Sequence, residues 1–244
     1  MACLLLVLLG ISWFLLHAPT QEHVVFLSPS EHKLAISGGR FAPLKQKFQW
    51  LIDPILKRFQ KAQPDIAISS HLFTLPLTKL DTLGLGPAVT TNTVGVRAWV
   101  LSPSQAKALR QTLETTDNFT LVNAPNISVT TEAGREAQIQ AVDLKILGGK
   151  LLPIGFVLDV LPTRSGASIK MILSTAYTEP SESAPDKSPE INLNFGAACR
   201  ALIPDGSTLV LAGGKSQGAG TNTYLVITTS QMVDSRGIPI SAKP

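Results

Sequence analysis

The chain has few of the residues from which metal centres and nucleophilic active sites are built. It contains two cysteines and four histidines among 244 residues, and all the histidines lie between His17 and His71. The sequence has no H-E-x-x-H or C-x-x-C metal spacing, no P-loop and no G-x-S-x-G turn. Asp143, Asp159 and Asp205 are candidate paired carboxylates of a hydrolase, but single carboxylates are common in turns and on strand faces. The sequence therefore predicts no metal, no cofactor and no catalytic residues, and a protein that is not an enzyme.

Charged and aromatic residues are also scarce, at 16% and 6% of the chain. The net charge is +4, and the basic residues are scattered apart from a cluster between Lys45 and Lys61. Nucleic-acid-binding proteins usually gather their basic side chains on one surface, so we expect no nucleic-acid partner. Hydrophobic residues make up 44% of the chain, which excludes a disordered protein and allows one large or two small domains.

An apolar run near the N-terminus indicates the compartment. Leu4–Leu16 is shorter than the roughly 20 residues that span a membrane, and its length is typical of a secretory signal. No basic residue precedes it and no A-x-A site follows it, so a retained anchor and a buried core helix are the alternatives. We interpret residues 1–20 as a signal peptide or short anchor of an exported cell-envelope protein. Removal of Cys3 would leave Cys199 without a disulfide partner, as a small buried strand residue.

The next segment, residues 21–63, is predicted as a linker followed by an amphipathic helix. The helix covers Pro43–Ala62, where apolar residues recur every three or four positions, and Pro54 predicts a kink. Its basic face would allow binding to an anionic membrane, and docking on the protein itself is the alternative.

Residues 64–118 predict a small α+β unit. Strands are expected at Asp65–Leu75 and Thr93–Leu101, separated by a connection rich in Gly, Pro and Thr. A helix is expected at Ser102–Thr115, because Ser102 and Gln105 have the spacing of a capping box and a proline occupies the first helical position.

From residue 119 to 236 the pattern predicts a multi-stranded antiparallel β-domain, followed by a tail over 237–244. The fold class is therefore β-rich α+β, with the β-domain a sandwich or a barrel. Asp205-Gly206 is expected in the tight turn of a hairpin that joins Cys199–Ile203 to Ser207–Leu211. Tyr177–Glu190, rich in Pro, Ser and acidic residues, is expected to be an exposed loop. The strand candidates are Thr120–Val122, Ile127–Thr131, Glu136–Lys145, Gly155–Leu161, Ser168–Thr175, Ile191–Leu202, Ser207–Leu211 and Thr223–Val233.

Four blocks of this β-rich half resemble, in the same order, the C-terminal domain of the bacterial secretins. Leu121–Ala141 resembles the secretin segment in which a strand with a central proline is followed by a glycine-containing turn and a second strand. Gly155–Pro162 resembles the family's "G-x-x-L-x-V-x-P" strand. Ser168–Leu173 follows it, as the paired strand does in the family. Asp205–Gly214 resembles "D-G-x-T-[IV]-x-[IL]-x-G-G", and Tyr224–Asp234 resembles the closing strand. The residues that carry the resemblance are Pro125, Gly134, Gly155, Pro162, Asp205, Gly206, Gly213 and Gly214.

The resemblance implies a small ring-building α+β unit followed by a secretin-like β-domain, in a homo-oligomeric ring or channel for protein secretion or pilus-type transport. It also implies contact with the membrane, a place in the outer membrane or periplasm, and other secretion-system or pilus components as partners. Where the family has a longer segment that contributes to the membrane-facing lip, this chain has only Lys215–Asn222. The alternative is a monomeric periplasmic β-sandwich, anchored by its N-terminus, that serves as a binding or regulatory module.

Overall fold

The computed structural model describes residues 23–28, 64–115, 119–122, 127–147, 150–180, 191–214 and 222–240. The predicted export segment, the predicted helix Pro43–Ala62 and Pro125 lie outside these ranges.

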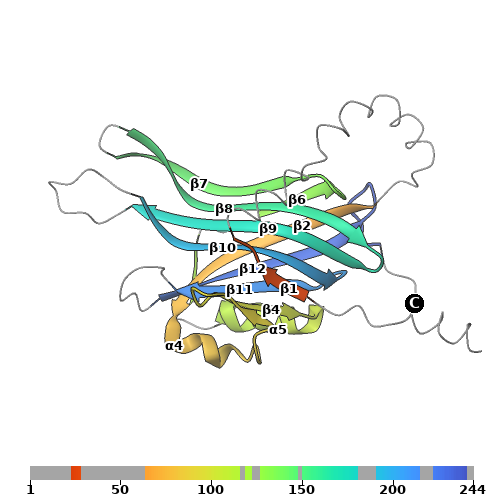
Figure 1. Ribbon diagram of the computed structural model, residues 1–244, viewed down its shortest axis with the longest axis horizontal. Helices are drawn as coiled ribbons and strands as arrows, with labels where there is room; N and C mark the ends of the chain where they lie inside the picture. Colours follow the sequence, from red (N-terminus) through yellow and green to blue (C-terminus); the bar gives the residue numbers. More distant parts are fainter. Residues whose placement is uncertain are drawn as a thin grey trace, which may run out of the picture.

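Two antiparallel sheets make up most of the fold, which confirms the predicted β-rich α+β class (Figure 1). The five-strand sheet has, in spatial order, β1 (His23–Phe26), β10 (Ile191–Pro204), β9 (Ser168–Pro180), β8 (Lys150–Ser165) and β7 (Ala137–Leu147). The seven-strand sheet has, in spatial order, β3 (Thr90–Thr91), β4 (Arg97–Leu101), β11 (Thr208–Gly214), β12 (Asn222–Val233), β2 (Asp65–Pro76) and β5 (Thr120–Leu121), while β6 (Ile127–Glu132) also pairs with β2.

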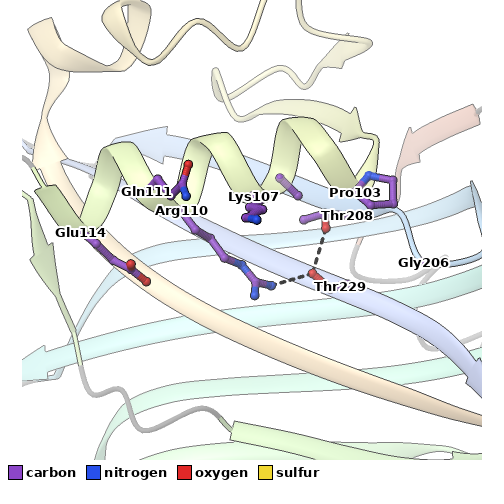
Figure 2. A pocket seen from close by; sticks show the side chains of 9 residues that line it. Pro103, Lys107, Arg110, Gln111, Glu114, Gly206, Thr208 and Thr229 are labelled. Atoms are coloured by element: carbon purple, nitrogen blue, oxygen red, sulfur yellow. Dashed lines mark hydrogen bonds between the residues drawn. The ribbon is translucent and has the colours of Figure 1, made fainter. Parts of the chain in front are cut away.

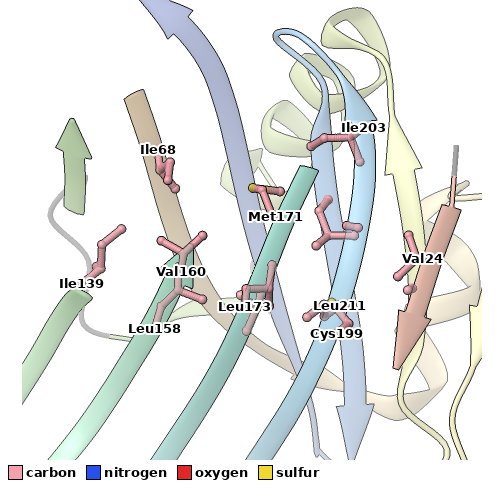
Figure 3. Packing of buried hydrophobic residues seen from close by; sticks show 14 of the residues in the cluster. Val24, Ile68, Ile139, Leu158, Val160, Met171, Leu173, Cys199, Ile203 and Leu211 are labelled. Atoms are coloured by element: carbon pink, nitrogen blue, oxygen red, sulfur yellow. The ribbon is translucent and has the colours of Figure 1, made fainter. Parts of the chain in front are cut away.

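The main hydrophobic core lies between the two sheets. Residues of β9 alternate, so that Ile169, Met171 and Leu173 are fully buried while Lys170 is exposed. Figure 3 shows Met171 and Leu173 in one cluster with side chains of the seven-strand sheet, among them Ile68 and Leu211. Period-two alternation therefore produces a sandwich, because each sheet buries one apolar face against the other.

A second core lies on the far face of the seven-strand sheet, under helix α5 (Pro103–Thr115) (Figure 1). Ala106, Leu109 and Leu113 of α5 are buried against this face. Strand β11 is covered on both sides, since alternate residues face the two cores, and this explains why residues 209–212 are apolar without interruption. The short helices α4 (Leu77–Leu80) and η1 (Asp81–Leu83) add Leu80 and Leu83 to the second core.

The predicted helix at Ser102–Thr115 is confirmed, together with its capping box. The Ser102 backbone N–H donates to Gln105 Oε1 at 2.9 Å, and the Gln105 N–H donates to Ser102 Oγ at 3.4 Å. The strand before it starts later than predicted, at Arg97 instead of Thr93. The reason is local, because Asn92 Oδ1 accepts hydrogen bonds from the N–H groups of Val94 and Val96 and holds that segment in a turn.

Three further sequence predictions are wrong in their extent. Residues 23–26, predicted as linker, form β1, because Val24 reaches the main core. The predicted loop Tyr177–Glu190 begins with strand, because β9 pairs with β10 as far as Pro180. The predicted tail begins with backbone that folds back on β12, where the Ile240 N–H donates to the Met232 carbonyl at 3.0 Å.

The predicted boundary between residues 64–118 and 119–236 does not separate the sheets. β2 pairs along its whole length with β12, and β4 pairs with β11. Strands from the two segments therefore form one sheet, because each covers an edge that the other would leave open.

Candidate functional site

The five-strand sheet ends in two edges that are not equivalent. At one edge β7, eleven residues long, pairs only with β8 among the described strands. At the other edge β1, four residues long, covers residues 199–202 of the fourteen-residue strand β10. Unpaired backbone N–H and C=O groups at a strand edge are a template for pairing with another chain. These two edges are therefore the candidate functional site.

Exposed apolar side chains gather on and beside these edges. Leu144 and Ile146, near the end of β7, are 64% and 74% exposed. At the opposite edge Val25 of β1 and Leu193 of β10 are 56% and 52% exposed. A groove of about 800 Å³ lies along the half of β10 that β1 does not cover, lined by Phe26, Leu193 and Ala198 among others. Apolar side chains next to an open edge favour association with another protein surface.

A largely buried polar network joins β9 and β10. The Tyr177 hydroxyl donates to Glu179 Oε1 at 2.9 Å, and the Asn194 Nδ2 group donates to the other oxygen of Glu179. Burial, with the Glu179 carboxylate as the second cause, raises the pKa of the Tyr177 hydroxyl above its usual range. Asn194 lies in the β-bulge between Leu193 and Phe195. Its hydrogen bond to Glu179 therefore joins β10 to β9 where the pairing of the two strands is irregular.

The structure brings several of the sequence-predicted motif residues together. The Gly134 N–H, in the turn between β6 and β7, donates to the Pro162 carbonyl of β8 at 2.6 Å. Gly155 lies in β8 between Val142 of β7 and Thr178 of β9. Gly213 and Gly214 end β11, and Gly213 packs closely under Val96 and Phe195. These residues position strands and turns.

Asp205-Gly206 forms a tight turn as predicted, but the predicted hairpin is wrong. β10 pairs with β9 in one sheet, while β11 pairs with β4 and β12 in the other, so the turn crosses between sheets. The Ser207 N–H donates to the Pro204 carbonyl at 3.1 Å, and Gly206, at the third position, has φ of 75°. The Asp205 carboxylate accepts from the Met232 N–H at 2.7 Å and fixes the turn to β12.

Replacing Gly206 by valine is therefore expected to lower stability by about 1–3 kcal/mol, because a β-branched residue is strained at positive φ. Thermal unfolding should then occur several degrees lower. Gly206→Asn is the matched control, since asparagine tolerates this conformation better and should cost less. An unchanged Tm for the valine variant would show that the turn does not require glycine.

A shallow groove of about 390 Å³ also lies between α5 and the seven-strand sheet (Figure 2). The Arg110 guanidinium reaches from α5 to β12, where its Nη2 group donates to Thr229 Oγ1 at 2.9 Å. Thr229 shares a second hydrogen bond with Thr208 of β11 at 2.8 Å. Burial, and then the charge of Arg110, lower the pKa of His71 on β2. Sequence reasoning missed this cluster, because Arg110 and Thr229 lie 119 residues apart and no motif joins them.

The hydrolase carboxylates are not brought together. Asp143 lies opposite Ile154, whereas Asp159 lies opposite Gln138, five residues away along β7, and Asp205 is in the turn that crosses between the sheets.

The described parts of the chain contain no group of three metal-binding side chains. In the same residues no helix is long and apolar enough to cross a membrane. Cys199 is fully buried, and burial raises the pKa of its thiol to about 12.

Comparisons with known proteins give matches among solved structures only. No family model and no curated protein matches the chain. The InvG secretin domain of the Salmonella SPI-1 injectisome aligns at 16% identity over 79% of this chain and 69% of its own, with a TM-score of 0.36. The type II secretion system secretin GspD of E. coli K12 aligns at 10% identity over 87% of this chain and 62% of its own, with a TM-score of 0.38. Aeromonas hydrophila ExeD aligns at 8% identity over 89% of this chain and 62% of its own, with a TM-score of 0.40.

Proposed function

We propose that this chain is a divergent secretin-like protein of the cell envelope, and that its copies join through the edges of the five-strand sheet into a ring or channel. Such a channel would serve protein secretion or pilus-type transport, with the membrane and other secretion-system or pilus components as partners. The proposal is supported by the position of one of the four secretin-like blocks and the segment that follows it. Gly155–Pro162 and Ser168–Leu173 lie on the adjacent strands β8 and β9 of the sheet with the open edges.

Strand direction supports joining of copies at these edges. β7, β8, β9 and β10 are consecutive and antiparallel, so β10 runs opposite to β7. The β7 edge of one copy can therefore pair with the β10 edge of the next and continue an antiparallel ladder. Contacts between two different edges are head-to-tail, and they produce a ring when the rotation between copies closes.

Strand length and apolar exposure also support assembly. The four strands have 11, 16, 13 and 14 residues, whereas strands of globular proteins usually have about 5–6. A β7–β10 junction would cover the edges beside Leu144, Ile146 and Leu193, which are exposed in the single chain. Long uncovered edges are rare in natural proteins because they promote aggregation, so a neighbouring copy is the simplest cover.

A monomeric binding module of the envelope is the second candidate. It is favoured by the sandwich itself, because the two sheets close over a core that one chain completes. Oligomeric state distinguishes the two candidates, since a binding module has no need for a large ring.

The test is the size of the full chain after extraction with mild detergent. We expect a very large, heat-resistant oligomer that fractionates with the envelope and appears as rings in negative-stain images. A monomer in sedimentation velocity over a wide concentration range would exclude ring formation by this chain alone and favour the binding module.

A further inference from the structure

Strand β1 occupies the edge that the proposed ring needs. Each of its four residues pairs with β10, from His23 opposite Leu202 to Phe26 opposite Cys199. The Leu27 N–H then donates to the Ala198 carbonyl at 2.8 Å and ends the contact. The remaining half of β10, residues 191–197, faces the groove that lies beyond β1.

Strand β1 is joined to the five-strand sheet by a short stretch of pairing with β10. Its Val24 side chain is 6% exposed and points into the main core, as Figure 3 shows, while Val25 is 56% exposed. The strand has four residues, against eleven in β7, so fewer backbone hydrogen bonds join it to β10 than a full-length neighbour could form. A strand from another copy can therefore replace β1 with a net gain of pairing.

Direction makes β1 and the β7 of a neighbouring copy direct competitors. β1 is antiparallel to β10, and a neighbour's β7 continuing the ladder would also be antiparallel to β10. With β1 in place, the neighbour's β7 would meet a strand that runs in its own direction, and the antiparallel ladder would be interrupted.

We propose that β1 is a latch that caps the β10 edge in the monomer and leaves it when a second copy pairs there. This inference rests on the proposed ring function and adds a regulatory step to it: release of residues 23–26 limits the rate of assembly.

The native Cys199 allows the latch to be locked by one introduced cysteine. Hydrogen bonding between Leu27 and Ala198 makes the neighbouring pair, Phe26 and Cys199, a non-hydrogen-bonded pair, in which Cα atoms are about 4.5 Å apart. That separation is within the range of a disulfide, and both side chains belong to the core-facing side of their strands. Phe26→Cys in a Cys3→Ser background can therefore form a single bridge between β1 and β10. Copper-phenanthroline is the oxidant, since the buried Cys199 thiol has a raised pKa and little thiolate at neutral pH.

The full chain in mild detergent is followed by sedimentation velocity and negative-stain imaging. We expect the oxidised Phe26→Cys variant to remain monomeric, and reduction with dithiothreitol to restore rings at the rate of the Cys3→Ser parent. The same variant with Cys199→Ala, treated with the oxidant, should assemble like the parent. If the locked protein forms rings as fast as the parent, the latch is wrong and the ring function stands. If the parent forms no rings at all, the ring function and the latch both fail.

A variant that weakens the attachment of β1 to the sheet gives a second test of the latch. Val24→Asn removes the one side chain of β1 that is fully inserted in the core, whereas Val25→Asn changes a neighbour on the solvent side. We expect Val24→Asn to form rings at least several-fold faster than the parent and Val25→Asn to leave the rate unchanged. Slower ring formation by Val24→Asn would mean that β1 is part of the assembled sheet and would overturn the proposal.

Discussion

Replacing Gly155 by alanine is expected to disrupt the pairing of β7 with β8 and to destabilise the chain by more than about 4 kcal/mol, a cost at the exceptional end for one substitution. Gly155 has φ of 137°, a conformation that residues with a side chain rarely adopt. An added Cβ would lie 2.2 Å from the Ala141 carbonyl oxygen and 3.0 Å from Val142 Cα. Both obstacles are backbone atoms of β7, so relief requires the strands to separate.

Chemical denaturation with urea, followed by circular dichroism, measures this effect. Gly214→Ala is the matched control, because Gly214 also lies in a strand, has an ordinary φ, and its added Cβ would meet only Asn222 O at 3.9 Å. We expect the control to stay within about 0.5–1 kcal/mol of the native chain. Equal stability of the two alanine variants would show that β7 and β8 do not approach as closely as described.

Placing lysines on the β7 edge is expected to abolish assembly while leaving the monomer folded. Leu144 and Ile146 are 64% and 74% exposed, so Leu144→Lys with Ile146→Lys removes little buried surface from the single chain. Charged side chains, lysine above all, protect natural strand edges from pairing. In a ring every junction would place two such charges on the strand that joins the copies, and we expect the concentration needed for assembly to rise at least about 100-fold, or about 3 kcal/mol for each junction.

The control carries the same change in charge on a different surface. Leu77 and Ile238 are 52% and 50% exposed and lie outside the five-strand sheet, so Leu77→Lys with Ile238→Lys should assemble like the native chain. Sedimentation velocity over a concentration series compares the two double variants. Rings of native size formed by the β7 variant would place the junction elsewhere on the molecule.

Features that depend on neighbours in the sequence could be predicted from the sequence alone. The strand at Ser168–Thr175, the capping box of Ser102 and the tight turn at Asp205-Gly206 were all predicted, and the structure has each of them. Strand period, helix capping and turn chemistry are local, because a few adjacent residues decide them.

Only the tertiary structure decided which strands lie together. Two strands joined by Asp205-Gly206 were expected to pair, yet β10 and β11 belong to different sheets, because their apolar faces are buried against each other across the core. The same holds for β1, predicted as linker, and for the bond between Arg110 and Thr229. The open edges that form the candidate site follow from this arrangement. A strand's own sequence specifies that it has two edges and an apolar face, but the partner that covers them is chosen by contacts far apart along the chain.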